Sequence, residues 1–150
     1  MKNLTFVFST ILLFTSCGDL YSEQDLSEFD EEIKAYIAEK KWVCERTESG
    51  LYFQILESGD GTFIPVDAKI LVTYKGQLLN SKVFDEQSAE PVVLYAKQLI
   101  EGWREALLFI EVGSSVRLII PPHLAYKNQD IPSIPKNSIL VFEMKIHGIE

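Results

Sequence analysis

The chain has 150 residues, of which 47% are hydrophobic and 24% charged. This length suits one domain that buries roughly 70% of its unfolded surface, and the apolar fraction excludes a disordered chain. The net charge of −8 predicts no nucleic-acid partner, and the two Cys and two His lack the ligand spacing of a structural zinc site, so we expect no metal and no cofactor.

The first sixteen residues have the pattern of a secretory signal peptide. Lys2 makes the start basic, an apolar run covers residues 4–14, and small residues follow it. The run is about 11 residues long, whereas a membrane-spanning helix takes roughly 20. We therefore expect residues 1–16 to be a signal peptide that is removed.

Cys17 directly follows these small residues. The segment from Phe14 to Cys17 resembles a bacterial lipoprotein processing site, with Phe14 where that family usually has Leu. The resemblance implies that Cys17 becomes the first mature residue and carries a lipid, which anchors the protein to a bacterial membrane outside the cytoplasm. The alternative is a plain secretory signal that leaves Cys17 as an ordinary thiol.

Residues 17–47 are predicted to form a lipidated tether and an amphipathic helix. From residue 26 to residue 42, apolar side chains recur at spacings of three and four: Leu26, Phe29, Ile33, Tyr36 and Ile37. The opposite face is mostly acidic. We expect this helix to pack on its own domain or to lie in the tether, and a helix that binds a partner is the alternative.

The rest of the chain reads mainly as strands. Alternation of apolar and polar residues predicts strands over residues 51–55, 68–79, 115–120 and 138–149, and a short strand at residues 83–84. Each of the first two is followed by a turn rich in small or polar residues. Such a succession of strands favours an antiparallel sheet.

One helix interrupts the strands. Residues 97–110 place Ile100, Trp103, Leu107 and Ile110 at helical spacing. Residues 121–136 form a loop with four prolines, and loops of this length are usually functional or disordered. The predicted fold is α+β: a curved antiparallel half-barrel sheet wrapped around one short helix, with an N-terminal helical extension.

The residues give little support for covalent or metal-assisted chemistry. His123 and His147 stand alone, no phosphate-binding glycine loop is present, and Cys44 next to Trp42 and Val43 is typical of a core thiol. What remains is a set of aromatic residues from five separate segments: Tyr74, Phe84, Trp103, Tyr126 and Phe142. The acidic residue Asp85 directly follows Phe84. By periodicity alone, such residues belong to the core.

Seven short blocks, taken together, are more specific. Their residues are 72–76, 83–85, 99–103, 120–122, 124–126, 134–135 and 140–143. In this order and spacing, they resemble the FK506-binding-protein type of peptidyl-prolyl cis-trans isomerase over residues 48–150. The resemblance implies a hydrophobic pocket between sheet and helix that binds proline-containing polypeptides.

The resemblance also implies roles for individual residues. Trp103 would be the pocket floor, Asp85 and Tyr126 its polar members, and the Ile100 backbone N–H a donor to the bound peptide. The expected catalytic residues are Tyr74, Phe84, Asp85, Ile100, Trp103, Tyr126 and Phe142. The expected substrate-binding residues are Val92, Leu99, Ala125 and Ile134. The chain departs from the family pattern at Lys127, where Gly is usual, and we expect a stiffer or reshaped pocket lip there.

An isomerase of this kind needs no nucleophile. Rotation about an X-Pro bond crosses a barrier of roughly 18–20 kcal/mol because twisting breaks amide resonance. A dry aromatic pocket suits the twisted, less polarised imide, and donors on the flanking carbonyls preorganise the turn. Tyr126 is the candidate donor, and Asp85 orders the polar rim without acting as a general base.

We thus expect a monomeric, lipid-anchored isomerase that assists the folding of exported proteins. The alternative is a non-catalytic binding or chaperone module on the same fold, which docks a Pro-containing envelope partner. A third hypothesis is a role in an envelope machine, because similar lipoprotein isomerases occur in gliding bacteria and the sequence around Cys17 resembles theirs.

Overall fold

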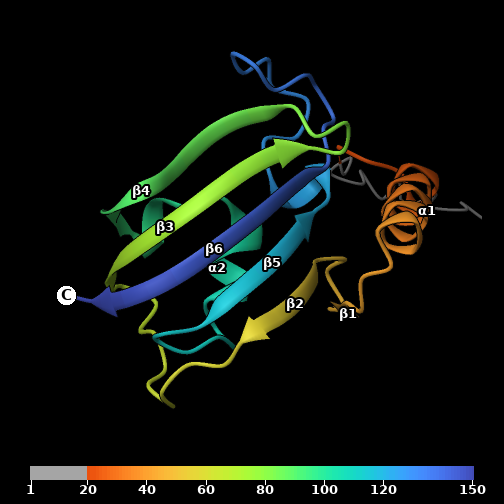
Figure 1. Ribbon diagram of the computed structural model, residues 1–150. Helices are drawn as coiled ribbons and strands as arrows, with labels where there is room; N and C mark the ends of the chain where they lie inside the picture. Colours follow the sequence, from red (N-terminus) through yellow and green to blue (C-terminus); the bar gives the residue numbers. More distant parts are fainter. Residues whose placement is uncertain (1–19) are drawn as a thin grey trace, which may run out of the picture.

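The computed structural model describes residues 20–150, and one antiparallel sheet dominates this part of the chain. Its six strands are β1 (Glu45–Arg46), β2 (Tyr52–Glu57), β3 (Lys69–Leu78), β4 (Val83–Tyr95), β5 (Ser115–Ile120) and β6 (Leu140–Ile149). They lie in the order β1-β2-β5-β6-β3-β4, so β1 and β4 are the edges of a curved sheet that does not close (Figure 1). Residues 1–16 and Cys17, where we predict a signal peptide and a lipid, lie outside the described residues.

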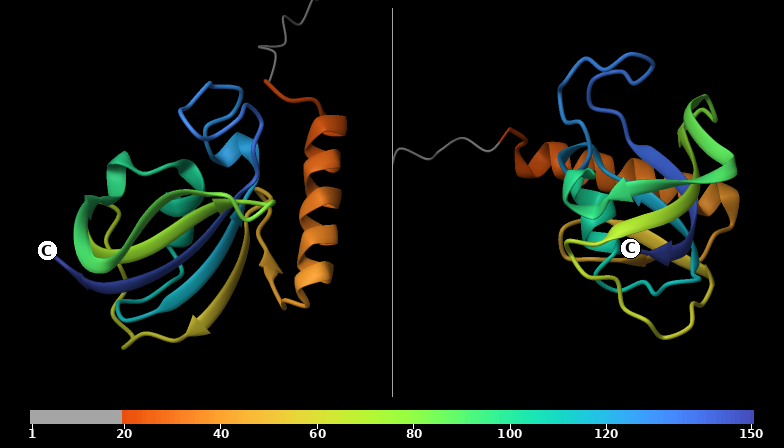
Figure 2. Two further views of the ribbon diagram at one scale, coloured as in Figure 1. Left: turned by 45° about the horizontal axis from the view of Figure 1, so that its top comes forward. Right: turned by 90° about the vertical axis from the view of Figure 1, so that its left-hand side faces the viewer.

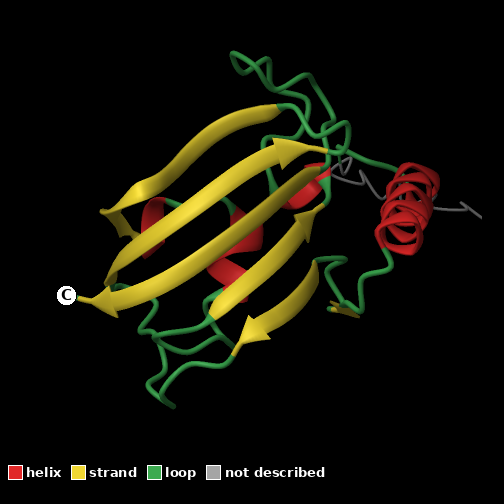
Figure 3. Ribbon diagram, in the orientation of Figure 1, coloured by secondary structure: helices red, strands yellow, loops and turns green. Residues whose placement is uncertain are grey.

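Helices lie on both faces of this sheet. The helix α2 (Glu101–Ala106) lies in the hollow of the sheet and is preceded by the 3-10 turn η1 (Ala96–Gln98). The long helix α1 (Glu23–Lys40) lies outside the hollow, and a second 3-10 turn, η2 (Pro122–Leu124), follows β5 (Figures 2 and 3). The predicted α+β half-barrel around one short helix is therefore confirmed.

Consecutive apolar residues in β5 and β6 reflect the burial of both faces. Leu118 and Ile120 point into the main core with α2, whereas Ile119 between them points to a second cluster under α1. In β6, Phe142 likewise belongs to the main core, and Val141 belongs to the cluster under α1. A strand buried on both sides loses the simple alternation of apolar and polar residues, because each face has an apolar layer against it.

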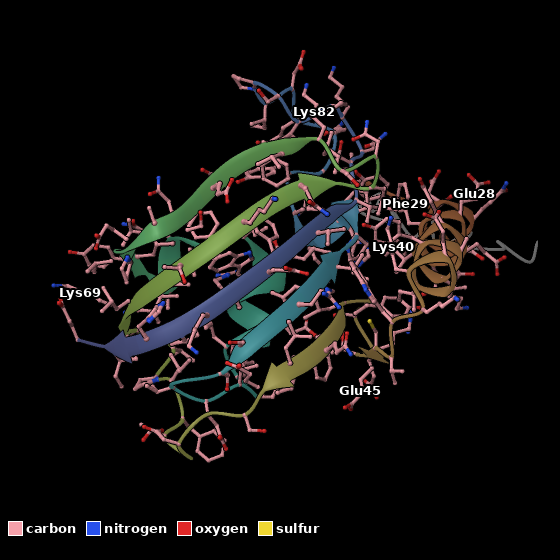
Figure 4. The ribbon with its side chains drawn as sticks, viewed as in Figure 1. Glu28, Phe29, Lys40, Glu45, Lys69 and Lys82 are labelled. Carbon is pink, nitrogen blue, oxygen red and sulfur yellow. The ribbon has the colours of Figure 1, made fainter. Side chains whose placement is uncertain are left out.

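The start of α1 is stabilised by a capping box at Ser22 and Asp25, in which each side chain binds the other residue's backbone N–H. Its buried Ile33 and Tyr36 pack on the outer face of the sheet. Phe29 lies on the side of the helix that faces the sheet, whereas Glu28 is exposed and points away from the sheet (Figure 4). The helix thus packs on its own domain, which was one of the two expected arrangements.

Polar contacts secure α1 to the sheet. Asp30 of the helix accepts hydrogen bonds from Arg46 Nε at 2.7 Å and from Tyr52 Oη at 2.8 Å. Just after the helix, the Trp42 ring lies 3.6 Å from the guanidinium carbon of Arg117 in β5. Stacked and hydrogen-bonded contacts of this kind fix the helix in one position rather than as a free tether.

Strand β4 is much longer than the predicted strand at residues 83–84. It pairs with β3 on one side only, and most of its side chains are exposed. Residues 85–91 therefore show no apolar alternation, and Pro91 is tolerated because an edge strand has an unpaired side. The missing signal has a physical cause, since an exposed edge strand does not need an apolar face.

The predicted helix over residues 97–110 is also corrected. Only Glu101–Ala106 is α-helical, because Ile100 is extended with φ −59° and ψ 154°, and residues 107–109 form turns. Trp103, Leu107 and Ile110 nevertheless all point into the core, which is why the periodicity looked continuous. No helix within residues 20–150 is long and apolar enough to cross a membrane.

Candidate functional site

A cavity of about 350 Å³ opens between the hollow face of the sheet, α2 and the loop at residues 131–134. Strands β3, β4 and β6 each contribute one wall. The cavity is lined by Tyr74, Phe84, Asp85, Leu94, Gln98, Leu99, Ile100, Trp103, Tyr126, Ile131, Pro132, Ile134 and Phe142. Its size and its mostly apolar lining with a few polar groups are typical of a small-ligand site.

Trp103 forms the floor, and only 3% of its surface is exposed. Its ring meets Tyr74 edge-on at 5.4 Å between centroids, and it meets Phe142 edge-on at 5.2 Å. Phe84 in turn meets Phe142 at 5.5 Å and 83°. Edge-to-face pairs hold aromatic rings in fixed orientations, so the cavity has rigid walls.

Gly76 makes this aromatic packing possible. A Cβ atom there would lie 2.6 Å from Phe142 Cε1 and 2.8 Å from the Phe84 ring. No side chain larger than hydrogen fits such a distance. Gly76 in β3 therefore lets the two phenylalanine rings pack directly against the backbone of the sheet.

The polar part of the cavity centres on Asp85. Tyr74 Oη donates a hydrogen bond of 2.7 Å to Asp85 Oδ2, and burial followed by this hydrogen bond raises the pKa of Tyr74. Burial, and then the charge of Asp85, also raises the pKa of Tyr126. Both phenols therefore stay protonated at neutral pH and can act as hydrogen-bond donors.

Two donors in the cavity wall are free. Among residues 20–150, neither the Tyr126 hydroxyl nor the Ile100 backbone N–H has a hydrogen-bond partner. Ile100 immediately precedes α2, and it lines the cavity together with Trp103. A bound peptide could thus find an apolar floor and two donors in the same cavity.

Lys127 shapes the loop that carries Tyr126. Its φ is +59°, the left-handed conformation that glycine adopts most easily. Its N–H donates to Pro122 O and its carbonyl accepts from the Asn137 N–H, both at 2.9 Å. Its Nζ lies 3.3 Å from Glu101 Oε1 at the start of α2. The lip therefore keeps a glycine-like backbone, with an added tie to the helix.

The structure brings most of the predicted site residues to this cavity. All seven residues expected to be catalytic line it, and so do Leu99 and Ile134. Val92 and Ala125 do not line it: both are partly buried and pack against the main core instead. Val92 pairs with Val72 in the β3–β4 ladder, on the same face as Leu94, but of these two residues only Leu94 reaches the cavity.

Sequence reasoning missed four lining residues, which are Leu94, Gln98, Ile131 and Pro132. Leu94 could have been found by alternation from Val92, had β4 been recognised as a long strand. Ile131 and Pro132 lie in the proline-rich loop, whose fold gives no periodic signal. Within residues 20–150, no group of three or more His, Cys, Asp or Glu residues could hold a metal ion.

Comparison with known proteins shows the family to which the chain belongs. The family model described as FKBP-type peptidyl-prolyl cis-trans isomerase matches residues 61–147. The chain belongs to this family. It is similar to FkpA, an FKBP-type peptidyl-prolyl cis-trans isomerase of Escherichia coli (strain K12), with 35% identity over 133 residues, 85% of this chain and 49% of that protein.

A second relative and a solved structure are similar to the chain as well. FkpA of Buchnera aphidicola (strain APS) is 39% identical over 103 residues, which cover 67% of this chain and 43% of the relative. The crystal structure of FkpA from Escherichia coli superposes with a TM-score of 0.73 at 32% identity, over 85% of this chain and 62% of that one. The chain spans about half the length of the curated relatives it matches.

Proposed function

We propose that this protein is a peptidyl-prolyl cis-trans isomerase that acts on proline-containing polypeptides and assists the folding of exported proteins. The observation that carries the proposal is the cavity itself. It combines a buried Trp103 floor and aromatic walls with an Asp85 carboxylate and free donors at Tyr126 and Ile100. Membership of the isomerase family supports the same activity.

The proposed mechanism uses this arrangement without covalent chemistry. The proline ring sits on Trp103 between the aromatic walls, where the twisted imide loses less on leaving water than the planar one. The Ile100 N–H and the Tyr126 hydroxyl hold carbonyls on either side of the proline, so that the chain is preorganised in the turned conformer. The Tyr74–Asp85 hydrogen bond orders the polar rim.

A proline-peptide isomerisation assay tests the activity. The chain from residue 18 onward should accelerate cis-trans exchange well above the spontaneous rate, which takes tens to hundreds of seconds per event. Phe84→Ala and Asp85→Ala should reduce the rate. A macrolide ligand of the family should compete with substrate. A background rate in folded protein would refute the proposal.

The same variants separate catalysis from binding in the cell. Should Phe84→Ala and Asp85→Ala abolish turnover while the cellular role survives, the protein acts as a binding or chaperone module. A role in a gliding or other envelope machine is a narrower version of that hypothesis. It rests on the resemblance around Cys17 alone.

We further propose that the protein works outside the cytoplasm as a lipid-anchored monomer. The pattern of residues 1–16 and the position of Cys17 support this. Residues 17–47 would then connect the lipid to the isomerase domain at residues 48–150, with α1 packed on that domain. Mass spectrometry of the native N-terminus tests the anchor, and an unmodified Cys17 would refute it.

A further inference from the structure

A second groove lies on the side of α2 away from the isomerase cavity. It has a volume of about 430 Å³ and shares no lining residue with that cavity. Its floor is apolar and buried, made of Ile64, Ala96, Leu107 and Leu124. Val66 and Leu108 form its rim and remain 66% and 59% exposed. Large apolar side chains exposed around an apolar hollow are typical of an interaction surface.

Four charged side chains line this groove, and only one of them forms an ion pair within residues 20–150. Of its two carboxylates, Glu101 pairs with Lys127 at 3.3 Å, whereas Glu105 accepts a hydrogen bond of 2.6 Å from the neutral Ser49 hydroxyl and keeps an unpaired charge. Lys97 and Arg104 also line the groove, and neither has a carboxylate within 4.0 Å among residues 20–150. The groove therefore has two cationic groups without an ion pair, against the single unpaired carboxylate of Glu105, and can bind an anion in a protein with a net charge of −8.

One stretch of chain serves both sites. Within residues 97–108, Gln98, Ile100 and Trp103 line the isomerase cavity, whereas Lys97, Arg104 and Leu108 line the groove. A helix with its side chains is about 10–12 Å across, so about four extended residues cross it. A polypeptide with its proline in the cavity can thus reach the groove with residues a few positions away.

We propose that this groove binds an extended, apolar polypeptide segment that carries a carboxylate. The apolar side chains fill the hollow over Leu107 and Leu124, and the carboxylate binds Arg104 and Lys97. The idea that one polypeptide occupies both the cavity and the groove rests on the proposed function. Binding at the groove itself requires no proline, which allows the two to be tested apart.

The test titrates the ¹⁵N-labelled full chain with a blocked, proline-free pentapeptide of two leucines and a valine between two glutamates. We expect amide shifts at Ala96, Arg104 and Leu108. A matched peptide with lysines in place of the glutamates should bind at least about tenfold more weakly, because it meets the cations of the groove.

Variants locate the site. Leu108→Glu and Arg104→Glu should each weaken binding of the glutamate peptide about tenfold or more, whereas Val43→Glu, at a position 81% exposed and outside the groove, should leave it unchanged. Arg104 is exposed and polar, so its variant can be judged even if Leu108→Glu folds poorly. Thermal unfolding of each variant verifies the fold.

Several results would overturn the proposal. They are the absence of binding at millimolar peptide, equal binding of the lysine peptide, and shifts confined to the cavity amides of Ile100 and Trp103. Self-association of the chain that Leu108→Glu abolishes would assign the groove to a second copy instead. A groove that binds the peptide in a chain without isomerase activity would refute the proposed function but uphold this inference.

Discussion

The Tyr74 hydroxyl lies 2.7 Å from Asp85 Oδ2 and donates a hydrogen bond to it across the β3–β4 ladder. Asp85 pairs in register with Gly76, two residues beyond Tyr74, so the two side chains meet diagonally on the hollow face of the sheet. The carboxylate is thereby held at the rim of the cavity. In the proposed mechanism, Asp85 therefore acts as an ordering group rather than as a base.

Substitutions at Asp85 distinguish these roles. Asp85→Asn keeps an acceptor for Tyr74, so we expect peptide isomerisation within about threefold of the unaltered chain. Asp85→Leu removes the acceptor and should reduce kcat/KM about tenfold, a loss of roughly 1.4 kcal/mol in transition-state stabilisation. Steady-state isomerisation assays measure both. If Asp85→Asn is as inactive as Asp85→Leu, the charge itself is required and the ordering role is wrong.

Gly76 offers a test of the aromatic walls. Gly76→Ala forces the Phe84 and Phe142 rings to move, since its Cβ would lie under 3 Å from both. We expect a loss of about 1–3 kcal/mol in the free energy of unfolding and a weaker affinity for proline peptides. Urea unfolding and peptide titration measure the two effects.

The matched control is Gly148→Ala in the neighbouring strand β6, where a new Cβ meets nothing within 4 Å. Its free energy of unfolding should change by less than about 0.5 kcal/mol. Equal effects at the two glycines would mean that backbone entropy, rather than contact with the rings, decides the outcome.

The contact of Asp30 with the sheet predicts an acid dependence of stability. Burial raises the pKa of Asp30, but hydrogen bonds from Lys34, Arg46 and Tyr52 outweigh it and lower the pKa from 3.8 to about 2. Because the folded pKa is depressed, the stabilisation is present above pH 4 and is lost as the pH falls from about 4 to 2. The shift corresponds to about 2 kcal/mol.

Urea unfolding between pH 2 and pH 6 measures this effect against Asp30→Asn. The difference in free energy of unfolding between the two chains should shrink as the pH falls through that window. Amide exchange should show α1 loosening first. A difference that is constant from pH 6 to pH 2 would show that the Asp30 charge does not hold the helix.

Lys127 predicts a contrast between two substitutions. Lys127→Gly removes the backbone strain of a left-handed non-glycine residue, but it loses the Glu101 ion pair at a cost of about 1 kcal/mol or less. We therefore expect its free energy of unfolding to lie within about 1 kcal/mol of that of the unaltered chain. Lys127→Val places a β-branched residue at φ +59° and should destabilise by about 1–3 kcal/mol. It should also slow isomerisation by displacing Tyr126.

Thermal unfolding and the peptide assay measure both variants. Similar behaviour of the glycine and valine variants would mean that the ion pair, and not the backbone conformation, shapes the lip.

Several elements follow directly from local pattern. The strand at residues 115–120 is observed with the predicted bounds, and α1 begins within three residues of the predicted helix. Local periodicity predicts these because their buried faces are continuous along the chain. The pocket aromatics come from five separate segments, and only the order of motif blocks, not periodicity, distinguished them from ordinary core residues.

Other features had no local signal. The length of β4 depends on pairing with β3, since its own side chains are largely exposed. Ile131 and Pro132 reach the cavity because a loop folds over it, and of the neighbours Val92 and Leu94 only Leu94 lines it. Such placements come from contacts between residues far apart in the chain.

The sequence by itself determined the α+β class through apolar periodicity, which is a local property, and it determined the family and most residues that line the cavity through the order of its motif blocks along the chain. Only the tertiary structure decided that α1 covers the outer face through Asp30 and Arg117, and that α2 separates the cavity above Trp103 from a second groove. These depend on the docking of whole elements. Their energies come from surfaces that meet only once the chain has folded.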